Sequence, residues 1–538
     1  MKLDALLNGI DYQLQQGNLN ECEITGLCED SRKIKNGDLF FCRTGAHTTG
    51  KKYLRQALFN GAAAVICDHY DEESKNIVSS QKSICVIETT VSEKTQARLA
   101  SNFYDFPQEK LLLIGVTGTK GKTTVCAMLQ KLFSDHRIRV ASVGTNGFFL
   151  DGKERISNHT TPELFELYSD LAEAVQAGCT HFLIEVSSLG VKQGRIAGLS
   201  FELGIFTNLY PDHIGGNEHA SFQEYAYWKK HFFDVCKRVL LNRDDPFSFE
   251  IAADKNGVCS WYSASVCADG YASDIQHIAK DGLYQTFLWH WQSESAKQMI
   301  LPLPGLCNVQ NAVAALSAFC LLTPTNFQTD SCLAANRSSD STSDSCESIA
   351  SDTFSQLTFQ NLYICGRFEV VGRFHGGLIL IDYAHNEVSL KNLLLALRDY
   401  HPARIICLFG CGGNRSRVRR AAMGRVSSEL ADLTVITQDN SRNESFEKIL
   451  ADILSGITEQ GNYVVIKDRR EAICYCMEQM RPGDLFVLAG KGHEKTQEIA
   501  GKVEAFSERA IVEEMIHRSH HCDKNDQRSC SHDKMKSL

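Results

Sequence analysis

Apolar residues recur along this chain as short continuous runs, separated by stretches with helical spacing. One run, Leu111–Val116, is followed by a glycine-rich turn and then by a helical pattern from Lys122 to Phe133. Continuous apolar runs of this length are typical of strands that are buried on both faces of a parallel sheet. The same reasoning predicts three more buried strands nearby, at His181–Val186, Leu203–Thr207 and Val239–Leu241.

The alternation of strand and helix patterns is most regular between residues 363 and 517. Strands are predicted at Leu378–Ile381, Ile405–Phe409, Leu433–Thr437, Tyr463–Ile466 and Leu485–Leu488, and helices are predicted to start near Val388, Val418, Ser445, Arg470 and Ser507. Such alternation indicates a parallel sheet covered by helices, which binds ligands at the carboxyl ends of its strands. We therefore predict an α/β fold.

Three domains separate by pattern. We expect a small N-terminal α/β domain at 1–107, a central domain at 108–362 and a Rossmann-like C-terminal domain at 363–518. Residues 324–358 are rich in Ser, Thr, Asp and Asn, as expected for a surface insertion, and the polar tail 519–538 is predicted to be disordered. The tail has a competing interpretation as a metal site, built from His517, His520, His521, Cys522, Cys530 and His532.

The composition argues against a disordered, a membrane-spanning or a nucleic-acid-binding protein. Of the 538 residues 43% are hydrophobic and 22% are charged, which excludes disorder over most of the chain. The net charge of −9 gives no general attraction to nucleic acid or to anionic membranes. No apolar run reaches the roughly 18 residues of a membrane span, and we see no signal peptide. We therefore expect a cytoplasmic monomer without nucleic-acid or membrane partners, whose 21 scattered cysteines are reduced.

The strongest motif follows the strand Leu111–Val116 and reads Gly-Val-Thr-Gly-Thr-Lys-Gly-Lys-Thr-Thr from Gly115 to Thr124. Small residues let backbone N–H groups turn inward around phosphate oxygens, and the helix N-terminus adds positive potential. Lys122 would bridge the β- and γ-phosphates, and the Thr123 hydroxyl would ligate Mg²⁺. This predicts a P-loop ATPase-type parallel sheet whose nucleotide contacts are Gly118, Thr119, Lys120, Gly121, Lys122, Thr123 and Thr124.

The motif resembles the ATP loop of the Mur ligases, the cytoplasmic peptide synthetases of peptidoglycan assembly. The resemblance extends from about residue 25 to 515 and is strongest to the members that add the third amino acid. It implies a first domain that binds the UDP end of the substrate. There, Asp30-Ser31-Arg32, with Ser31 as a substrate contact, and Gly45-Ala46-His47 are similar to uridine-side motifs.

For the central domain the resemblance implies an ATPase site with two Mg²⁺ ions. Glu185 would bind Mg²⁺, His213 would bind the second metal, and Lys229 falls where the family carries a carbamylated lysine that ligates Mg²⁺. A glutamate that ends an apolar strand is costly to bury unless it is paired or metal-bound, which favours this role for Glu185. The implied catalytic residues are Lys122, Glu185, His213 and Lys229, and the implied metal ligands are Thr123, Glu185, His213 and Lys229. The implied dipeptide contacts are Thr160, Thr161, Ser187 and Arg195, and the implied adenine contact is Asn308.

For the third domain the resemblance implies a site for the incoming amino acid. Arg367 would touch phosphates, Asp382 would touch the ribose, and Asp439-Asn440-Ser441-Arg442 resembles the specificity motif. An Arg at position 442 can grip the distal carboxylate of meso-diaminopimelate through two hydrogen bonds, and Glu494 would meet the distal ammonium. The implied substrate contacts in this domain are Arg415, Asp439, Asn440, Arg442, Gly490 and Glu494.

The implied reaction is ATP-dependent amide formation through an acyl phosphate. The expected cofactors are ATP and Mg²⁺, and the expected partners are a UDP-N-acetylmuramoyl dipeptide and a diamino acid. Meso-diaminopimelate is favoured over lysine or another diamino acid, but the sequence leaves both open. It also leaves open a related ligase, such as a folylpolyglutamate or cyanophycin synthetase, and a nucleotide-binding partner protein without activity.

Overall fold

The computed structural model describes residues 1–43, 50–79, 81, 83–211, 218–255, 258–280, 282–323, 357–415 and 417–519. Several features singled out in the sequence lie outside these ranges: Gly45-Ala46-His47, His213, most of the polar stretch from residue 324, and the tail from residue 520. The chain divides into two compact units. The first contains residues from 1–263 with 314–323, and the second contains residues from 264–313 with 357–519.

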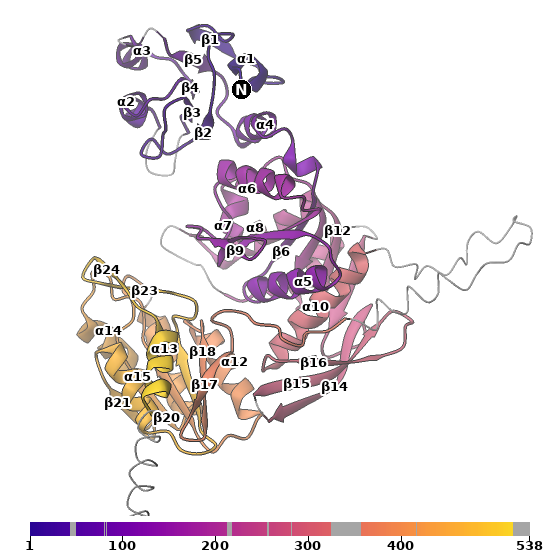
Figure 1. Cartoon of the computed structure of the whole chain (residues 1–538), viewed down its shortest axis with the longest axis vertical. Helices are drawn as coiled ribbons and strands as arrows, with labels where there is room; N and C mark the ends of the chain where they lie inside the picture. The colour runs from indigo at the N-terminus through magenta and orange to yellow at the C-terminus, as the bar shows by residue number, and fades with distance from the viewer. Residues whose placement is uncertain are drawn as a thin grey trace, which may run out of the picture. The chain divides into compact units, whose positions relative to one another are not determined.

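The first unit begins with a five-stranded sheet of order β1-β5-β4-β3-β2, in which only β1 and β5 pair antiparallel. Side chains alternate between the two faces of a strand. Phe40 of β3 therefore packs with α2 and α3, and its neighbours Leu39 and Phe41 pack with α1 and α4. Figure 1 shows these helices around the sheet. The elements are β1 (Gln13–Gln16), β2 (Gly26–Cys28), β3 (Asp38–Phe41), β4 (Ala64–Cys67), β5 (Cys85–Glu88), α1 (Leu3–Leu6), α2 (Leu54–Phe59), α3 (Glu72–Val78) and α4 (Glu93–Phe103).

The larger sheet of the first unit has the order β13-β12-β11-β6-β10-β7-β8-β9. Its strands are parallel from β13 to β7, and only β8 and β9 are antiparallel. The four predicted strands correspond to β6, β10, β11 and β12, whereas β7 and β13 were not predicted. The strands are β6 (Leu112–Thr117), β7 (Val140–Gly144), β8 (Gly147–Leu150), β9 (Lys153–Arg155), β10 (His181–Glu185), β11 (Phe201–Phe206), β12 (Cys236–Asn242) and β13 (Cys259–Ser263). The helices are α5 (Lys122–Asp135), α6 (Leu164–Gln176), α7 (Ser188–Lys192), α8 (Phe222–His231) and α9 (Phe247–Ala253).

The second unit starts with an antiparallel meander that the apolar runs did not predict. It consists of β14 (Gly270–Ala279), β15 (Leu283–Trp291) and β16 (Lys297–Leu301). Helix α10 (Leu306–Leu322) follows and belongs to the second unit as far as Val313. Buried and partly exposed residues do not alternate strictly along β15, because three consecutive residues in it are buried. The alternation of apolar and polar residues that would predict a strand is therefore weak.

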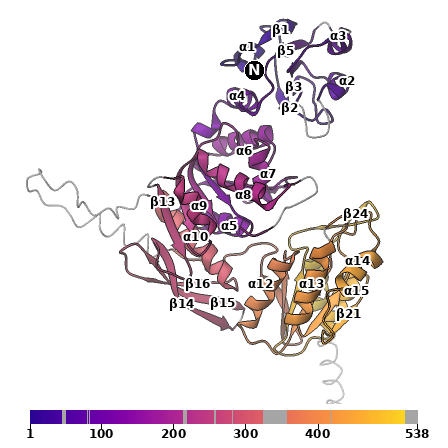
Figure 2. The same cartoon turned by 180° about the vertical axis from the view of Figure 1, so that it is seen from behind.

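The C-terminal sheet has the order β17-β18-β22-β19-β20-β21, and only β17 runs antiparallel to its neighbour. Successive residues of β18 belong to different cores: Leu378 and Leu380 pack with α12–α14, whereas Ile379 and Ile381 pack with α15. Figure 2 shows these helices around the sheet. Both faces are therefore covered, which explains the continuous apolar runs. The strands are β17 (Glu369–Phe374), β18 (Gly377–Asp382), β19 (Ile405–Phe409), β20 (Leu433–Ile436), β21 (Tyr463–Val465) and β22 (Leu485–Ala489).

The five predicted helices of this region are also present. They are α12 (Glu387–Arg398), α13 (Arg417–Leu430), α14 (Phe446–Leu454), α15 (Arg469–Glu478) and a last helical stretch at residues 508–519. A small hairpin, β23 (Thr496–Ile499) with β24 (Lys502–Ala505), follows β22 and was not predicted. No disulfide joins the cysteines within the described ranges. None of the helices there has the length and apolar character that a membrane crossing requires.

Candidate active site

The predicted phosphate loop joins β6 to α5. Gly118 and Gly121 have φ angles of 146° and 89°, in the region that favours glycine. A Cβ atom on Gly118 would lie 1.8 Å from the Thr207 hydroxyl oxygen, so the loop passes the end of β11 too closely for any side chain. The Lys120 N–H donates to the Asn208 Oδ1 at 2.8 Å, and the Thr207 hydroxyl donates to the Lys120 carbonyl at 2.6 Å. The loop is thus held in shape by the residues that follow β11.

Two lysines converge on one carbonyl of this loop. The Nζ atoms of Lys122 and Lys229 each donate to the Gly118 oxygen at 2.8 Å. Lys229 comes from α8, is only 1% exposed and lies over the Tyr225 ring at 4.8 Å. The adjacent Lys230 instead pairs with a surface carboxylate, that of Asp254, at 2.7 Å. The structure therefore distinguishes the two lysines, because it brings Lys229 and not Lys230 to the phosphate loop.

Glu185 ends β10 beside the start of α5. The Thr123 hydroxyl donates to its Oε2 at 2.9 Å, and Thr145 donates to the same carboxylate from both its backbone N–H and its hydroxyl, at 3.1 Å each. A Cβ atom on Gly144, the last residue of β7, would lie 2.1 Å from the Glu185 Oε1. The Glu185 carboxylate therefore occupies the space that a side chain at position 144 would need. Sequence reasoning missed Thr145, whose signal is its position directly after β7, the neighbour of β10.

The predicted dipeptide-binding residues lie next to Glu185. The Thr161 hydroxyl donates to the Glu185 carbonyl at 2.8 Å and accepts the Ser187 N–H at 2.9 Å. The Thr160 and Thr145 hydroxyls are 3.2 Å apart. These hydroxyls and the Glu185 carboxylate form one continuous hydrogen-bonded group at the carboxyl ends of β7 and β10.

Arg195 and Ser31 are also buried polar groups. Arg195 donates from Nη1 to the Thr161 carbonyl at 2.8 Å and pairs with the Glu163 carboxylate at 2.8 Å. Burial lowers the pKa of Arg195, and the negative charge of Glu163 opposes that shift. Ser31 lies in the N-terminal sheet domain, where its hydroxyl donates to the Gln56 side chain at 2.8 Å. The structure brings Arg195 to the dipeptide-binding residues but leaves Ser31 in a separate cluster.

Asp382 ends β18 in the second unit. Its two oxygens accept the Phe368 and Ala384 N–H groups, each at 2.8 Å. Burial raises the pKa of Asp382 even though the Arg367 cation opposes the shift. The Arg367 guanidinium lies 5.0 Å above the Tyr383 ring. The two predicted nucleotide contacts of this unit, Arg367 and Asp382, are therefore neighbours.

Asn308, the predicted adenine contact, lies in the first turn of α10. It donates to the Pro304 carbonyl at 2.7 Å and accepts a hydrogen bond from Asn311 at 3.3 Å. The side chain is nearly buried and is oriented by these two contacts.

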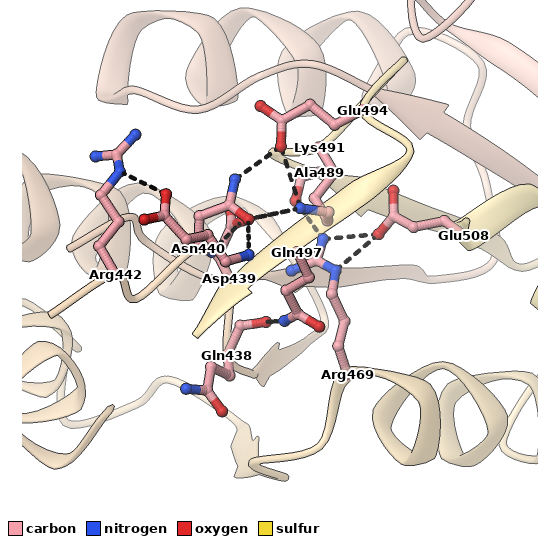
Figure 3. Close-up of polar contacts among 11 residues, drawn as sticks. Gln438, Asp439, Asn440, Arg442, Arg469, Ala489, Lys491, Glu494, Gln497 and Glu508 are labelled. Carbon is pink, nitrogen blue, oxygen red and sulfur yellow. Dashed lines mark hydrogen bonds and ion pairs between the residues drawn. The ribbon is translucent and has the colours of Figure 1, made fainter. Parts of the chain in front are cut away.

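Asp439, Asn440 and Glu494, three of the predicted specificity residues, form a largely buried polar network at the ends of β20 and β22 (Figure 3). Lys491, which has no exposed surface, donates to Asn440 Oδ1 at 3.1 Å and to Glu494 Oε2 at 3.1 Å, and its Nζ lies 3.5 Å from Asp439 Oδ1. Burial alone raises the pKa of Asp439, but the Arg469 and Lys491 cations hold that pKa below its usual range. Sequence reasoning placed the motif that contains Lys491 at a strand end but did not single out the lysine.

Arg442 lies at the edge of this network and has a left-handed backbone, with φ of 51°. Its N–H donates to the Glu498 carbonyl at 3.1 Å, and its Nη1 donates to the Gly413 carbonyl at 2.8 Å. Gly490, at the end of β22, has φ of 113° and would place a Cβ atom 3.2 Å from Asp439. Arg415 lies in the exposed loop after β19.

The oxygen atoms near the phosphate loop suit Mg²⁺. The Glu185 carboxylate and the Thr123 hydroxyl are hard oxygen donors beside the helix N-terminus, and Mg²⁺ is usually held by one or two carboxylates together with substrate phosphates. Within the described ranges no group of three or more His, Cys, Asp or Glu side chains could hold a metal by itself. The residues therefore fit a metal that completes its coordination with nucleotide oxygens.

Three family models match the chain in succession. The Mur ligase family, catalytic domain, matches residues 23–103, the Mur ligase middle domain matches residues 116–319, and the Mur ligase, glutamate ligase domain, matches residues 366–492.

Relatives extend along nearly the whole chain. A protein of Caldanaerobacter subterraneus subsp. tengcongensis, named UDP-N-acetylmuramoyl-L-alanyl-D-glutamate–2,6-diaminopimelate ligase, is 33% identical over 521 residues, which are 96% of this chain and 100% of that protein. A protein of Gloeobacter violaceus with the same name is 35% identical over 522 residues, which are 96% of this chain and 98% of that protein.

Solved structures share the fold. One described by the same ligase name has a TM-score of 0.62 and 28% identity, and the match covers 97% of this chain and 99% of that chain. A folylpolyglutamate synthase of Mycobacterium tuberculosis, complexed with ADP and AMPPCP, has a TM-score of 0.55 and covers 74% of this chain and 92% of its own; at 17% identity this likeness shows the fold alone. The chain belongs to the Mur ligase family of ATP-dependent amide ligases.

Proposed function

We propose that this chain joins meso-diaminopimelate to UDP-N-acetylmuramoyl-L-alanyl-D-glutamate, with conversion of ATP to ADP and phosphate. The observation that carries the choice of amino acid is the pair of opposite charges at the specificity motif, Arg442 and Glu494. Glu494 is bonded to Asn440, which accepts the Glu498 N–H, and the Arg442 guanidinium lies 3.5 Å from the Glu498 carboxylate. The distal end of diaminopimelate carries a carboxylate and an ammonium, so it needs both charges. The names of the relatives support the same substrate.

In this reaction the protein mainly positions the dipeptide carboxylate, the ATP and the amino group, and it forms no covalent bond to them. The terminal carboxylate of the dipeptide attacks the γ-phosphorus, the bond to the β–γ bridging oxygen breaks, and ADP leaves. The amino group of the diamino acid then attacks the acyl phosphate, loses a proton, and expels inorganic phosphate as the amide forms. Lys122 would stabilise the charge on the transferring phosphoryl group.

We assign the remaining roles in the first unit to its own residues. Thr160, Thr161, Ser187 and Arg195 would hold the dipeptide, and Ser31 the uridine side. Mg²⁺, when bound, supplies positive charge to the phosphate oxygens, and Thr123 and Glu185 would hold it. Lys229, as a carbamate, and His213 would serve a second ion.

In the second unit, Asn308, Arg367 and Asp382 would contact the nucleotide, and Arg415, Asp439, Asn440 and Gly490 would surround the amino acid. This division of roles uses three domains, at 1–107, 108–362 and 363–518. It places the ATP-activated carboxylate on one domain and the attacking amine on another.

Phosphate release by the purified chain tests the proposal. The assay contains ATP, Mg²⁺ and the UDP-linked dipeptide, with meso-diaminopimelate or L-lysine added in separate reactions. We expect release that depends on diaminopimelate, and a product whose mass is that of the tripeptide. Comparable rates with lysine would refute the choice of amino acid, and no release with either would refute the ligase reaction on this substrate.

A further inference from the structure

Glu494 uses only one of its two carboxylate oxygens inside the polar network. Oε2 accepts hydrogen bonds from Asn440 Nδ2 at 2.8 Å and from Lys491 Nζ at 3.1 Å. Oε1 takes part in none of the hydrogen bonds between described residues, and Figure 3 shows it directed away from Lys491 and Asn440. The carboxylate is therefore fixed at one oxygen and presents the other.

Asn440 is almost fully occupied by the protein itself. Its Oδ1 accepts from Lys491 Nζ at 3.1 Å and from the Glu498 N–H at 3.0 Å, and its Nδ2 donates to Glu494. An amide group has two acceptor sites and two donors, so a single N–H remains for a ligand. Asn440 thus acts mainly as a bridge between Lys491 and Glu494.

The charges of this buried cluster do not balance. Arg469 and Lys491 are its cations, and Asp439, Glu494 and Glu508 are its carboxylates, so one negative charge is in excess when all are ionised. A buried cation is costly unless it is paired and hydrogen-bonded, and Lys491 meets that requirement through Asp439, Asn440 and Glu494. Since Glu494 is the partly exposed carboxylate of the three, an incoming ammonium would neutralise the cluster there.

We propose that Lys491 is a positioning residue for the amino-acid substrate. It fixes Glu494 through Oε2 and so directs Oε1 toward the distal ammonium of the diamino acid. This inference rests on the proposed function, because it assigns the ammonium contact to Glu494. In this role Lys491 does not contact the substrate itself. Its removal should therefore weaken only the recognition of the distal ammonium of the diamino acid.

The test compares Lys491→Met with Lys495→Met, which makes the same change at an exposed neighbouring lysine. Lys491→Met removes the charged hydrogen bond that holds Glu494 Oε2. Because hydrogen bonds between charged groups are among the stronger ones, we expect the KM for meso-diaminopimelate to rise about ten- to a hundredfold in this variant. The KM values for ATP and the UDP-linked dipeptide should stay within about twofold, since neither substrate meets Glu494. Lys495→Met should behave as the wild type. An unchanged KM for diaminopimelate in Lys491→Met overturns the inference.

Two further measurements separate positioning from a general structural role. In a Glu494→Gln background, Lys491→Met should add little to the KM for diaminopimelate, because the two residues act on one contact. With 2-aminopimelate, which lacks the distal ammonium, Lys491→Met should leave the KM unchanged. Additive effects in the first case, or an equal loss with 2-aminopimelate, contradict a role through Glu494.

Folding is checked by circular dichroism, and Lys491→Gln provides a second route if Lys491→Met does not fold. That variant removes the cation that holds Glu494 Oε2 and should raise the KM for diaminopimelate selectively; a uniform loss for all three substrates would overturn the inference. Wild-type enzyme that releases no phosphate with diaminopimelate refutes the proposed function instead, so the two failures are distinguishable.

Discussion

Arg469 and Glu508 form a buried ion pair that joins α15 to the last helical stretch. The Arg469 Nε donates to Glu508 Oε1 at 2.8 Å, its Nη2 donates to the Ala489 carbonyl at 3.0 Å, and the two side chains are 0% and 2% exposed. Burial raises the pKa of Glu508, and the Arg469 cation opposes that rise. Arg469→Met leaves a buried carboxylate without its cation, which costs about 3–5 kcal/mol.

Amide hydrogen exchange of residues 508–519 measures this cost locally, which matters because a chain of two units does not unfold as one cooperative step. At pH 8, we expect protection of these amides to fall by about two to three and a half orders of magnitude in Arg469→Met. Glu508 binds a proton more readily in the folded than in the unfolded state. Without the opposing Arg469 cation this pKa rises further, so the variant gains more stability from protonation than the wild type does. The loss should therefore shrink as the pH falls toward the carboxyl's ordinary value of 4.5.

The adjacent arginine provides the matched control. Arg470 pairs with Glu514, and both side chains are well exposed, so Arg470→Met should cost about 1 kcal/mol or less. The double change Arg469→Met with Glu508→Leu removes both charges and should restore most of the protection. Equal effects of the two single arginine changes, or no recovery in the double variant, would refute the reasoning.

Three further predictions concern the site and its pH response. Gly118→Ala should abolish nucleotide binding, measured by calorimetry with ADP, because its Cβ would overlap the Thr207 hydroxyl; binding at wild-type affinity contradicts the loop geometry. Thr145→Val should raise the Mg²⁺ concentration needed for half-maximal turnover about threefold or more, because Glu185 loses a hydrogen bond of about 1 kcal/mol; an unchanged Mg²⁺ titration counts against that role. Burial, aided by the Arg367 cation, lowers the pKa of His493 to about 4. The folded state should therefore lose stability as the pH falls from 6.5 toward 4, because the unfolded chain binds the proton more readily. The unfolding temperature of His493→Gln should fall less over that range than that of the wild type.

Four buried strands of the central sheet, and the five parallel strands and five helices of the C-terminal region, were predictable because both faces of these sheets are covered. Ile405–Phe409 is confirmed with its bounds, and Leu111–Val116 is shifted by one residue to Leu112–Thr117. Strands β7–β9, β13 and β17, the meander at β14–β16 and the β23–β24 hairpin were missed. Glu498 lies in such a hairpin, where all four residues of β24 are exposed, and an exposed two-stranded ribbon leaves little apolar periodicity in the sequence.

The candidate site was predictable where a motif directly follows a buried strand. Glu185 and Asp382 each end such a strand, so their position at the carboxyl edge followed from the pattern. The partners of these residues depend on which strands are neighbours in the sheet, and local sequence patterns do not predict the order of the strands. Thr145 reaches Glu185 only because β7 pairs with β10, and Lys491 reaches Asn440 only because both loops follow strands of one sheet.

The close backbone contacts among the loops after β19, β20 and β22 limit how substrate choice can be re-engineered. A Cβ atom on Gly413 would lie 1.9 Å from the Ser441 carbonyl, and the Arg442 N–H donates to the Glu498 carbonyl at 3.1 Å. The three loops therefore pack against one another as one interlocking group. A graft that exchanges residues 439–442 alone would meet a mismatched neighbour on each side, whereas a chimera that exchanges 410–415, 438–442 and 490–498 together keeps the contacts among these three loops.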